Sequence, residues 1–385
     1  MGSEGAGKGG VMAQRFSQRL SSAVRGASER MGSLRGSQTD KNEIRQKQAL
    51  TDKGITLVER LGVGGQGEVF KATMRLKGGE EAVAVKVIPK SMVRDEDSKS
   101  AVRLEISLLS EIEHPNVVKF YTAIEDSKYW YVVIELLNGG DLYDRIQKGA
   151  FSEMQIVKFA EYTFSILQHL HAMNIAHRDL KLENFMLHKD VETGEETVKL
   201  IDFGLAYKRK NNKKFVTDGH PGTLSYQAPE IVRQQAYIPE KVDVWCAGVM
   251  IYSAVEKAFP FYGENERQIE RAILVNKPKC SSPSWRLAGP EFEAIVRLCL
   301  EKDQKKRPTA TQALKKIRHI TNQKVAASPR HNPQTVDLSN KDTRLRRMGR
   351  AMSSRFTSSG SQRNLTASGS SKFLSSGSSK NLAVA

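Results

Sequence analysis

Cysteine is scarce in this chain of 385 residues, which contains three. Cys246, Cys280 and Cys299 have neither metal-ligand spacing nor an even number for disulfide pairing, and this suits a reducing compartment inside the cell. Long apolar runs are also missing, because the longest, Val244 to Tyr252, is far shorter than the ~20 residues that a membrane-spanning helix needs. The N-terminal residues lack the apolar core of a secretory signal peptide. We therefore expect a cytoplasmic protein.

Acidic side chains are too few to balance the basic ones, 43 against 60, and the net charge is +17. The excess lies mostly at the two ends, where residues 1–53 carry 10 basic and 5 acidic side chains and residues 321–385 carry 11 and 2. The middle, 54–320, keeps a net charge of only +3. Both ends are rich in Ser and Gly and poor in aromatic residues. We therefore expect two disordered basic tails and no specific nucleic-acid ligand.

A glycine-rich segment opens the central region. Residues 61–69 read LGVGGQGEV, and the β-branched run Val83–Ile88, which contains Lys86, follows after a turn at 78–79. In a dinucleotide-binding fold, glycines with this spacing run directly into a helix. Here the pattern is strand, loop and strand, so the glycines predict a loop that lies between two strands of a sheet.

Two further elements of the central region have clear patterns. Apolar residues spaced three apart predict a helix over 101–112. Aromatic and β-branched residues predict a strand over 129–137, which Asn138-Gly139-Gly140 ends. Farther along the chain, Thr193-Gly194 predicts the turn of a hairpin. The mixture of strands and helices indicates an α+β domain.

The stretch Ile175–Gly204 carries the densest set of reactive side chains. It predicts a loop with Asp179, Lys181 and Asn184, and later a strand that runs into Asp202. Phosphoryl transfer needs a carboxylate to orient a hydroxyl, a cation on the transferred group, and oxygen ligands for metal ions. These four side chains have those chemistries in that order.

Taken together, these motifs resemble the eukaryotic protein kinases, whose catalytic loop and metal-binding motif read HRDxKxxN and DFG. The resemblance covers residues 54–320 and includes the GTxxYxAPE segment at 222–230. It is greatest to the calcium/calmodulin-dependent and calcium-dependent kinases, although no EF-hand calcium loop follows in this sequence. It implies an α+β fold of two lobes: a small β-rich N-lobe over 54–137, a hinge over 135–141, and a larger helical C-lobe over 141–320.

The resemblance also implies the reaction. The chain would be a serine/threonine protein kinase that uses ATP and Mg²⁺, because Lys181 with GTxxY downstream favours serine and threonine over tyrosine as acceptors. Asp141 and Glu183 would favour an arginine three residues before the acceptor. The implied catalytic residues are Asp179, Lys181, Asn184, Lys86 and Glu105, with Glu111 as the alternative partner of Lys86. Asn184 and Asp202 would hold the metal.

The nucleotide site follows from the same resemblance. Ile134 would guard its rear, Asp141 would meet the ribose, and Glu135 and Leu137 would offer backbone groups to the adenine. The residues that the resemblance places around ATP are Leu61, Gly62, Gly64, Gly67, Val69, Ala84, Lys86, Glu135, Leu137, Asp141, Met186 and Asp202.

Supporting contacts are implied as well. Asp243 would brace the catalytic loop, and Arg307 would pair with Glu230. Thr223 would hydrogen-bond the pair formed by Asp179 and Lys181. Thr217 is a candidate for activating phosphorylation.

The alternative is a pseudokinase, a scaffold that acts through its basic tails. A pseudokinase usually lacks one of Lys86, Asp179, Asn184 and Asp202, and all four are present here. The tails space apolar residues among arginines, as in a basic amphipathic helix. We expect a monomer whose tails bind a calmodulin-like protein or an acidic membrane surface, which would place it at the membrane periphery.

Overall fold

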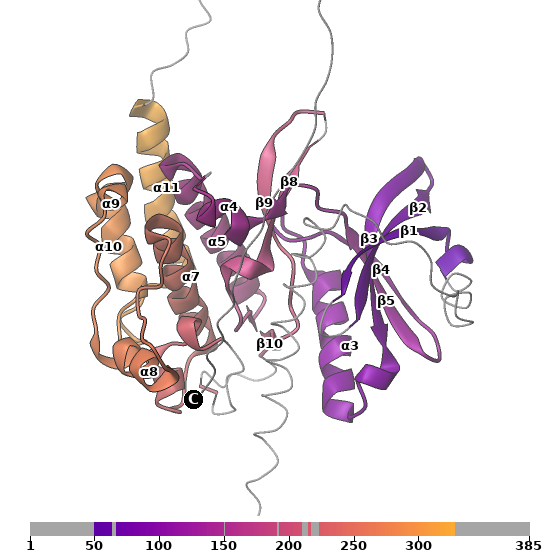
Figure 1. Ribbon diagram of the computed structural model, residues 1–385, viewed down its shortest axis with the longest axis horizontal. Coiled ribbons are helices and arrows are strands. Elements are labelled where there is room, and N and C mark those ends of the chain that lie inside the picture. Colours follow the sequence, from indigo (N-terminus) through magenta and orange to yellow (C-terminus); the bar gives the residue numbers. More distant parts are fainter. Residues whose placement is uncertain are drawn as a thin grey trace, which may run out of the picture. The chain divides into compact units, whose positions relative to one another are not determined.

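The computed structural model describes residues 50–63, 67–149, 151–190, 192–209, 215–216 and 223–327. Figure 1 shows one lobe that contains a β-sheet and the helix at 96–111, and a second lobe made mostly of helices. These are the two lobes that the sequence predicts, and the α+β fold is confirmed. Most of both predicted tails, residues 1–49 and 328–385, lies outside the described residues.

The N-lobe is a five-stranded antiparallel sheet in the order β1-β2-β3-β5-β4. Its strands are β1 (Ile55–Val63), β2 (Glu68–Leu76), β3 (Gly79–Pro89), β4 (Phe120–Glu125) and β5 (Tyr129–Glu135). Successive side chains along β3 point to opposite faces of the sheet. Val83, Val85 and Val87 enter the core on the outer face of the sheet, whereas Ala84 and Lys86 line the cleft between the lobes.

Helix α3 (Glu96–Glu111) packs beside β4. It starts five residues before the predicted range, because Asp95 caps it by accepting a hydrogen bond from the Ser98 backbone N–H at 2.8 Å. Its first turn, which includes Glu96 and Asp97, is charged and exposed. Apolar periodicity therefore could not reveal it.

Leu50 extends the packed N-lobe towards the N-terminus. Its side chain is fully buried in the outer core with Ile55, Met74 and Tyr131. At the other end of the described residues, helix α11 (Ala310–Ala327) ends at Ala327. The packed residues therefore run slightly beyond the predicted limits of 54 and 320 at both ends.

The C-lobe is built around α7 (Pro239–Glu256), which is buried along most of its length. Helix α5 (Glu153–Ala172) packs against both α7 and α11 (Ala310–Ala327). The other helices are α4 (Leu142–Gln147), α6 (Pro229–Val232), α8 (Glu266–Val275), α9 (Pro283–Ala288) and α10 (Pro290–Cys299). An apolar sequence without one polar face explains why α7 lies in the middle.

Short strands position the catalytic loop at the edge of the C-lobe. One sheet has the order β6-β8-β9, and β10 pairs with β7. These strands are β6 (Gly140–Asp141), β7 (Ile175–Ala176), β8 (Phe185–Lys189), β9 (Glu196–Leu200) and β10 (Tyr207–Lys208). The predicted hairpin joins β8 to β9, where the Asp190 carboxylate accepts a hydrogen bond from the Thr193 N–H at 2.7 Å.

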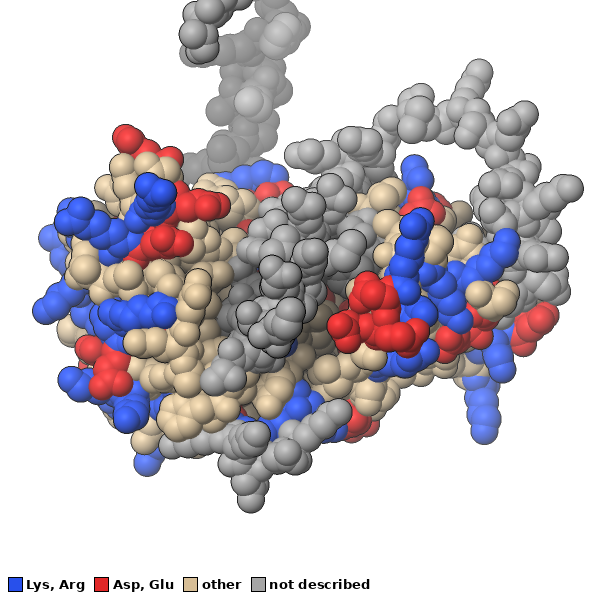
Figure 2. Space-filling view, turned by 90° about the horizontal axis from the view of Figure 1, so that it is seen from below, with Lys and Arg blue, Asp and Glu red and all other residues tan. Residues whose placement is uncertain are grey.

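The surface has both signs of charge. Figure 2 shows Lys and Arg side chains interspersed with Asp and Glu over this face of the described residues, as the small net charge of residues 54–320 leads one to expect. The three cysteines are all free thiols. In the part of the chain that the structure describes, every helix is too short or too polar to cross a membrane.

Candidate active site

An ion pair between the sheet and α3 lies at the inner end of the cleft. Lys86 Nζ is 2.7 Å from Glu105 Oε1, and both side chains are buried. Glu111, the alternative partner, lies at the surface and pairs with Lys208 instead. Burial raises the pKa of the Glu105 carboxyl, the Lys86 ammonium opposes that rise, and nearby Asp202 adds to it.

The cleft between the lobes has a volume of about 260 Å³ and mostly apolar walls. Leu61, Val69 and Ala84 cover it from the sheet, and Met186 lies on the C-lobe side. Gly62, Lys86, Glu105, Ile134, Glu135 and Leu137 also line it, as the sequence leads one to expect. Such walls fit a flat aromatic base, with a buried cation at the inner end for an anionic group.

Sequence reasoning missed seven residues of this lining: Leu109, Val118, Val132, Leu136, Asn138, Gly140 and Ile201. Ile201 could have been predicted to line the cleft, because it directly precedes Asp202. Leu136, Asn138 and Gly140 could also have been predicted, because they lie in the expected hinge. The other three are Leu109 of α3, Val132 of β5 and Val118, which precedes β4. From the sequence, an apolar residue in such a position cannot be distinguished from one in the hydrophobic core.

Of the other four expected nucleotide-site residues, Gly67, Asp141 and Asp202 do not line the cleft. Gly64 is outside the described residues. Gly67 does not line the cleft, but a Cβ atom there would lie 1.8 Å from the Val87 carbonyl oxygen, so only glycine fits. Asp141 pairs in register with Met186, at the edge of the cleft, and caps α4 by accepting a hydrogen bond from the Asp144 N–H at 3.0 Å.

Both the backbone N–H and the carboxylate of Glu135 have partners. Its backbone N–H donates to the Lys119 carbonyl oxygen at 2.8 Å, so this N–H is not the group that would meet an adenine. Its carboxylate lies 3.0 Å from Lys199 Nζ, on β9. The latter contact joins the N-lobe to the C-lobe next to the cleft.

The catalytic loop brings its three predicted side chains together. Lys181 Nζ donates to Asp179 Oδ2 at 2.6 Å. The Asn184 amide donates to the Asp179 carbonyl oxygen at 2.8 Å and lies 3.4 Å from Asp179 Oδ2. Lys181 and Asn184 follow Asp179 by two and five residues. Both can contact Asp179 because the one-turn helix at 182–184 folds Asn184 back towards it.

Asp202 is buried just after the strand β9. Its Oδ1 accepts a hydrogen bond from the Gly204 N–H at 2.9 Å. The neighbouring Phe203 ring packs against the His177 ring, with centroids 5.2 Å apart. Burial lowers the pKa of the His177 imidazole, so the loop holds this ring in its neutral form.

Asp243 of α7 braces the loop, as the resemblance implies. Its Oδ2 accepts from the His177 N–H at 2.9 Å and its Oδ1 from the Arg178 N–H at 2.8 Å. Arg178 has φ of +64°, which is unfavourable for a residue with a side chain. The carboxylate thus holds a strained backbone directly before Asp179.

The expected contact from Thr223 is not among the hydrogen bonds of the described residues. Thr223 precedes the short helix 224–226 and uses its carbonyl to accept from the Tyr226 N–H at 2.9 Å. Tyr226 makes the contact with the loop instead: its hydroxyl is 3.3 Å from Glu183 Oε2 and 3.4 Å from the Leu182 N–H. Thr217 lies outside the described residues.

The predicted pair of Arg307 and Glu230 is present. The guanidinium donates to both carboxylate oxygens, at 2.6 and 2.7 Å, and both side chains are buried. Such bidentate pairing fixes orientation as well as distance. It anchors the start of α6, next to the segment that carries Tyr226.

The arrangement can therefore do three things: bind a flat base between apolar walls, hold anionic groups beside Lys86, and orient an acceptor with Asp179. Asn184 and Asp202 present oxygen atoms of the kind that Mg²⁺ prefers. In the described residues, no group of three His, Cys, Asp or Glu side chains forms a site for a more tightly held metal ion.

Comparison with known proteins agrees with this geometry. Residues 55–317 match the family model of the protein kinase domain. The chain is 35% identical to calcium-dependent protein kinase 3 of Plasmodium yoelii yoelii over 258 residues, which are 67% of this chain and 46% of that protein. It is 36% identical to calcium-dependent protein kinase 25 of Arabidopsis thaliana over 260 residues, 67% of this chain and 48% of that protein.

A human relative matches over a larger share of its own length. Calcium/calmodulin-dependent protein kinase type 1B of Homo sapiens is 34% identical over 260 residues, 67% of this chain and 73% of that protein. The chain spans only about half the length of the calcium-dependent relatives. The match to the family model nevertheless covers more than half of this sequence, so the chain belongs to the protein kinase family.

Proposed function

We propose that this protein is a serine/threonine protein kinase that transfers the γ-phosphoryl group of ATP, with Mg²⁺, to proteins. The observation that carries the proposal is the burial of five charged and polar side chains: Lys86 lines the cleft, and the other four lie on the segments that lead into its lining residues Met186 and Ile201. The exposed fractions are 5% for Lys86, 6% for Asp179, 3% for Lys181, 1% for Asn184 and 5% for Asp202. Burying such groups is costly for folding, and functional sites are where proteins retain them.

Each residue has a role that follows from its contacts. Glu105 holds Lys86 at the inner end of the cleft, where the ammonium meets the phosphates. Asp179 orients the acceptor hydroxyl and takes up its proton late in the transfer. Lys181, 2.6 Å from Asp179, places a positive charge where negative charge develops. Bound Mg²⁺ supplies neutralisation of the phosphate oxygens, and Asn184 and Asp202 would hold it.

The acceptor class and its context are the finer part of the proposal. Serine and threonine are favoured because Lys181 lies beside Asp179, as in the serine/threonine kinases that the motifs resemble. An arginine three residues before the acceptor is favoured by the Glu183 carboxylate, which is partly exposed and lies beside Tyr226. Asp141 is a weaker candidate because its carboxylate already caps α4.

The test is a phosphorylation assay of the purified full chain with Mg-ATP and a degenerate peptide library. Asp179→Ala should lower kcat by about 10²–10⁴, since it removes the general base. Asp97→Ala, which removes an exposed carboxylate on α3, is the matched control and should act like wild type. Glu183→Gln should weaken the arginine preference while leaving kcat for an arginine-free peptide unchanged. Near-normal transfer by Asp179→Ala would refute the assignment.

A regulatory partner for the tails is a second element of the proposal. Residues 321–385 carry a net charge of +9, and the human relative is named for its dependence on calcium and calmodulin. We infer that a calcium-binding protein of this kind, or an acidic membrane, binds the basic tail segments. Activity with and without calcium-loaded calmodulin, in the full chain and in a form that ends at 327, would test it. Equal activities in all four assays would reject calmodulin.

The pseudokinase alternative predicts binding without transfer. It would be favoured if the wild-type chain bound ATP and partners but gave no phosphorylated product with any peptide in the library.

A further inference from the structure

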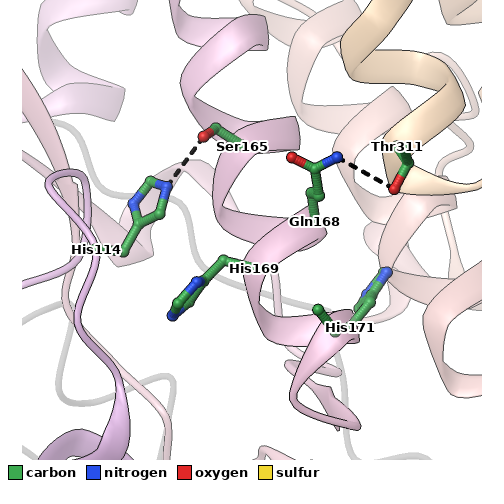
Figure 3. Close-up of a pocket in the computed structure, with 7 residues that line it drawn as sticks. His114, Ser165, Gln168, His169, His171 and Thr311 are labelled. Carbon is green, nitrogen blue, oxygen red and sulfur yellow. Dashed lines mark hydrogen bonds between the residues drawn. The ribbon is translucent and has the colours of Figure 1, made fainter.

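A groove on the C-lobe lies apart from the catalytic cleft. It consists of two cavities, of about 700 and about 690 Å³, which adjoin because His171 and Thr311 line both. The first cavity lies along α5. Figure 3 shows Gln168 of α5 bonded to Thr311 at the start of α11, and His114 bonded to Ser165. Among the described residues, those that line the cleft and those that line this groove are different.

The second cavity is lined by three basic side chains from separate parts of the chain. Arg209 follows β10, Lys241 lies in the first turn of α7, and Lys305 precedes α11. Among the described residues, Glu240 is the only acidic one in this lining, and it pairs with Arg209. The charges of Lys241 and Lys305 are therefore not balanced within the lining.

The surroundings of the two lysines favour a negatively charged ligand. Lys241 Nζ donates to the Arg307 carbonyl oxygen, which fixes the ammonium at the wall of the cavity. Lys305 is exposed, and in the described part of the chain no carboxylate forms an ion pair with it. The first turn of α11 lines the same cavity, and Thr309 caps this helix by accepting from the Gln312 N–H at 3.2 Å. The positive end of the helix dipole therefore adds to the positive charge.

The shape and polarity of the groove indicate which anion it takes. Most residues that line it are polar, whereas sites for small molecules are mostly apolar. The first cavity follows α5 from Ser165 to Ala172, a distance of about 10 Å at ~1.5 Å per residue. About three residues of an extended peptide have that length. Both tails of this chain carry a net positive charge, so neither complements the groove.

We propose that this groove docks an acidic peptide segment of another protein. Carboxylates of the segment lie beside Lys241 and Lys305, and its backbone continues along α5 past Gln168. His171 only shapes the groove, because its Nε2 already lies 2.9 Å from Asp243 Oδ2. The docked segment leaves the cleft open, and its binding does not depend on phosphoryl transfer.

The experiment measures the binding of a fluorescein-labelled peptide to the purified full chain by fluorescence anisotropy. In this peptide glutamate alternates with serine, and a twin peptide with glutamine in place of glutamate should bind about tenfold more weakly. Lys305→Glu should weaken the binding of the glutamate peptide about tenfold, because an attraction becomes a repulsion. Thr311→Glu places a carboxylate between the two cavities and should weaken binding about fivefold. Both changes are at exposed positions, so both variants should fold.

Lys77→Glu is the matched control. It changes the net charge as much as Lys305→Glu does, but in an exposed turn of the N-lobe, and its affinity should stay within about twofold of wild type. Equal affinities of Lys305→Glu and Lys77→Glu would show that the net charge alone attracts the peptide and would overturn the proposal. The absence of binding by wild type would also overturn it. Displacement of the peptide by inorganic phosphate, but not by sodium chloride at the same ionic strength, would assign the groove to a small anion and refute peptide docking.

Amide NMR of the ¹⁵N-labelled full chain locates the bound peptide. The amide signals of Asn174 and Thr311, which line the groove, should move during titration with the glutamate peptide and stay during titration with its glutamine twin. The Lys77 amide should stay in both titrations. Shifts that leave Asn174 and Thr311 unmoved while the peptide binds would place it elsewhere and refute the proposal.

Discussion

Replacing Arg307 with methionine should destabilise the C-lobe strongly. Arg307 is 2% exposed and Glu230 is 3% exposed, so the pair has almost no contact with water. The guanidinium makes two bonds to Glu230, at 2.6 and 2.7 Å, and donates through Nε to the Glu301 carbonyl oxygen at 2.8 Å. It also donates to the Lys241 carbonyl oxygen at 3.0 Å. Methionine fills much of the space but supplies none of these donors.

The size of the effect follows from what is left behind. Removing one partner of a buried ion pair leaves an uncompensated charge, which typically costs about 3–5 kcal/mol of the free energy of unfolding. The lost bonds to the two carbonyl groups argue for at least the middle of that range. For a domain of this size, ~1 kcal/mol lowers Tm by about 2–4 °C. We therefore expect Arg307→Met to unfold roughly 8–20 °C below wild type.

Thermal and urea unfolding followed by circular dichroism measure this loss. Arg318→Met is the control, because the Arg318 side chain is 53% exposed and its pair with Glu161 lies at the surface. Such a pair contributes less than about 1 kcal/mol. Adding Glu230→Gln to Arg307→Met should recover part of the stability, since it removes the buried charge. If Arg307→Met unfolds within a degree or two of Arg318→Met, the argument from the unpaired charge is wrong.

Two smaller predictions concern stability outside the cleft. Leu50→Ala should lower the free energy of unfolding by about 2–4 kcal/mol, because it empties a fully buried position in the outer core of the N-lobe. At low temperature, kcat of the folded enzyme should stay unchanged. A loss below ~1 kcal/mol in urea unfolding would contradict the packing. Burial, followed by the charge of His169, lowers the pKa of His114 from 6.5 to about 4, so the unfolded chain binds a proton that the folded chain does not between these pH values. The contribution of His114 to the free energy of unfolding is therefore complete above pH 6.5 and is lost as the pH falls from 6.5 towards 4. His114→Gln should reduce the change in the free energy of unfolding between pH 7 and pH 5 by roughly 1 kcal/mol, a figure lowered to allow for the partial exposure of the ring.

The catalytic loop was the most predictable part of this protein. Asp179, Lys181 and Asn184 lie within six residues of one another, and a single turn brings them into contact. The pair of Lys86 and Glu105 was harder to predict, because strand β3 and helix α3 had to be predicted separately and then placed side by side. The resemblance to kinases supplied that step. The spacing of the two residues alone could not have done so.

Other features left no readable pattern. Leu50 is one apolar residue in a polar segment, and only the outer face of the sheet explains why it is buried. The first turn of α3 is charged, so the apolar stripe began too late to show where the helix starts. His171 looked like an ordinary residue near a helix end, because its partner Asp243 lies 72 positions away. Propensity and periodicity report local preference, and these three features depend on contacts between distant segments.

The catalytic loop keeps its shape through a contact with a residue that is distant in the sequence. The neighbouring strands β7 and β10 have two residues each, too few to hold an adjacent backbone by sheet hydrogen bonds alone. Arg178 adopts a conformation that its own side chain disfavours. The support comes instead from Asp243, 65 positions farther along the chain, on the most deeply buried helix of the C-lobe. The side chains that we propose to take part in the reaction are therefore close together in the sequence, whereas the residue that holds their backbone is distant.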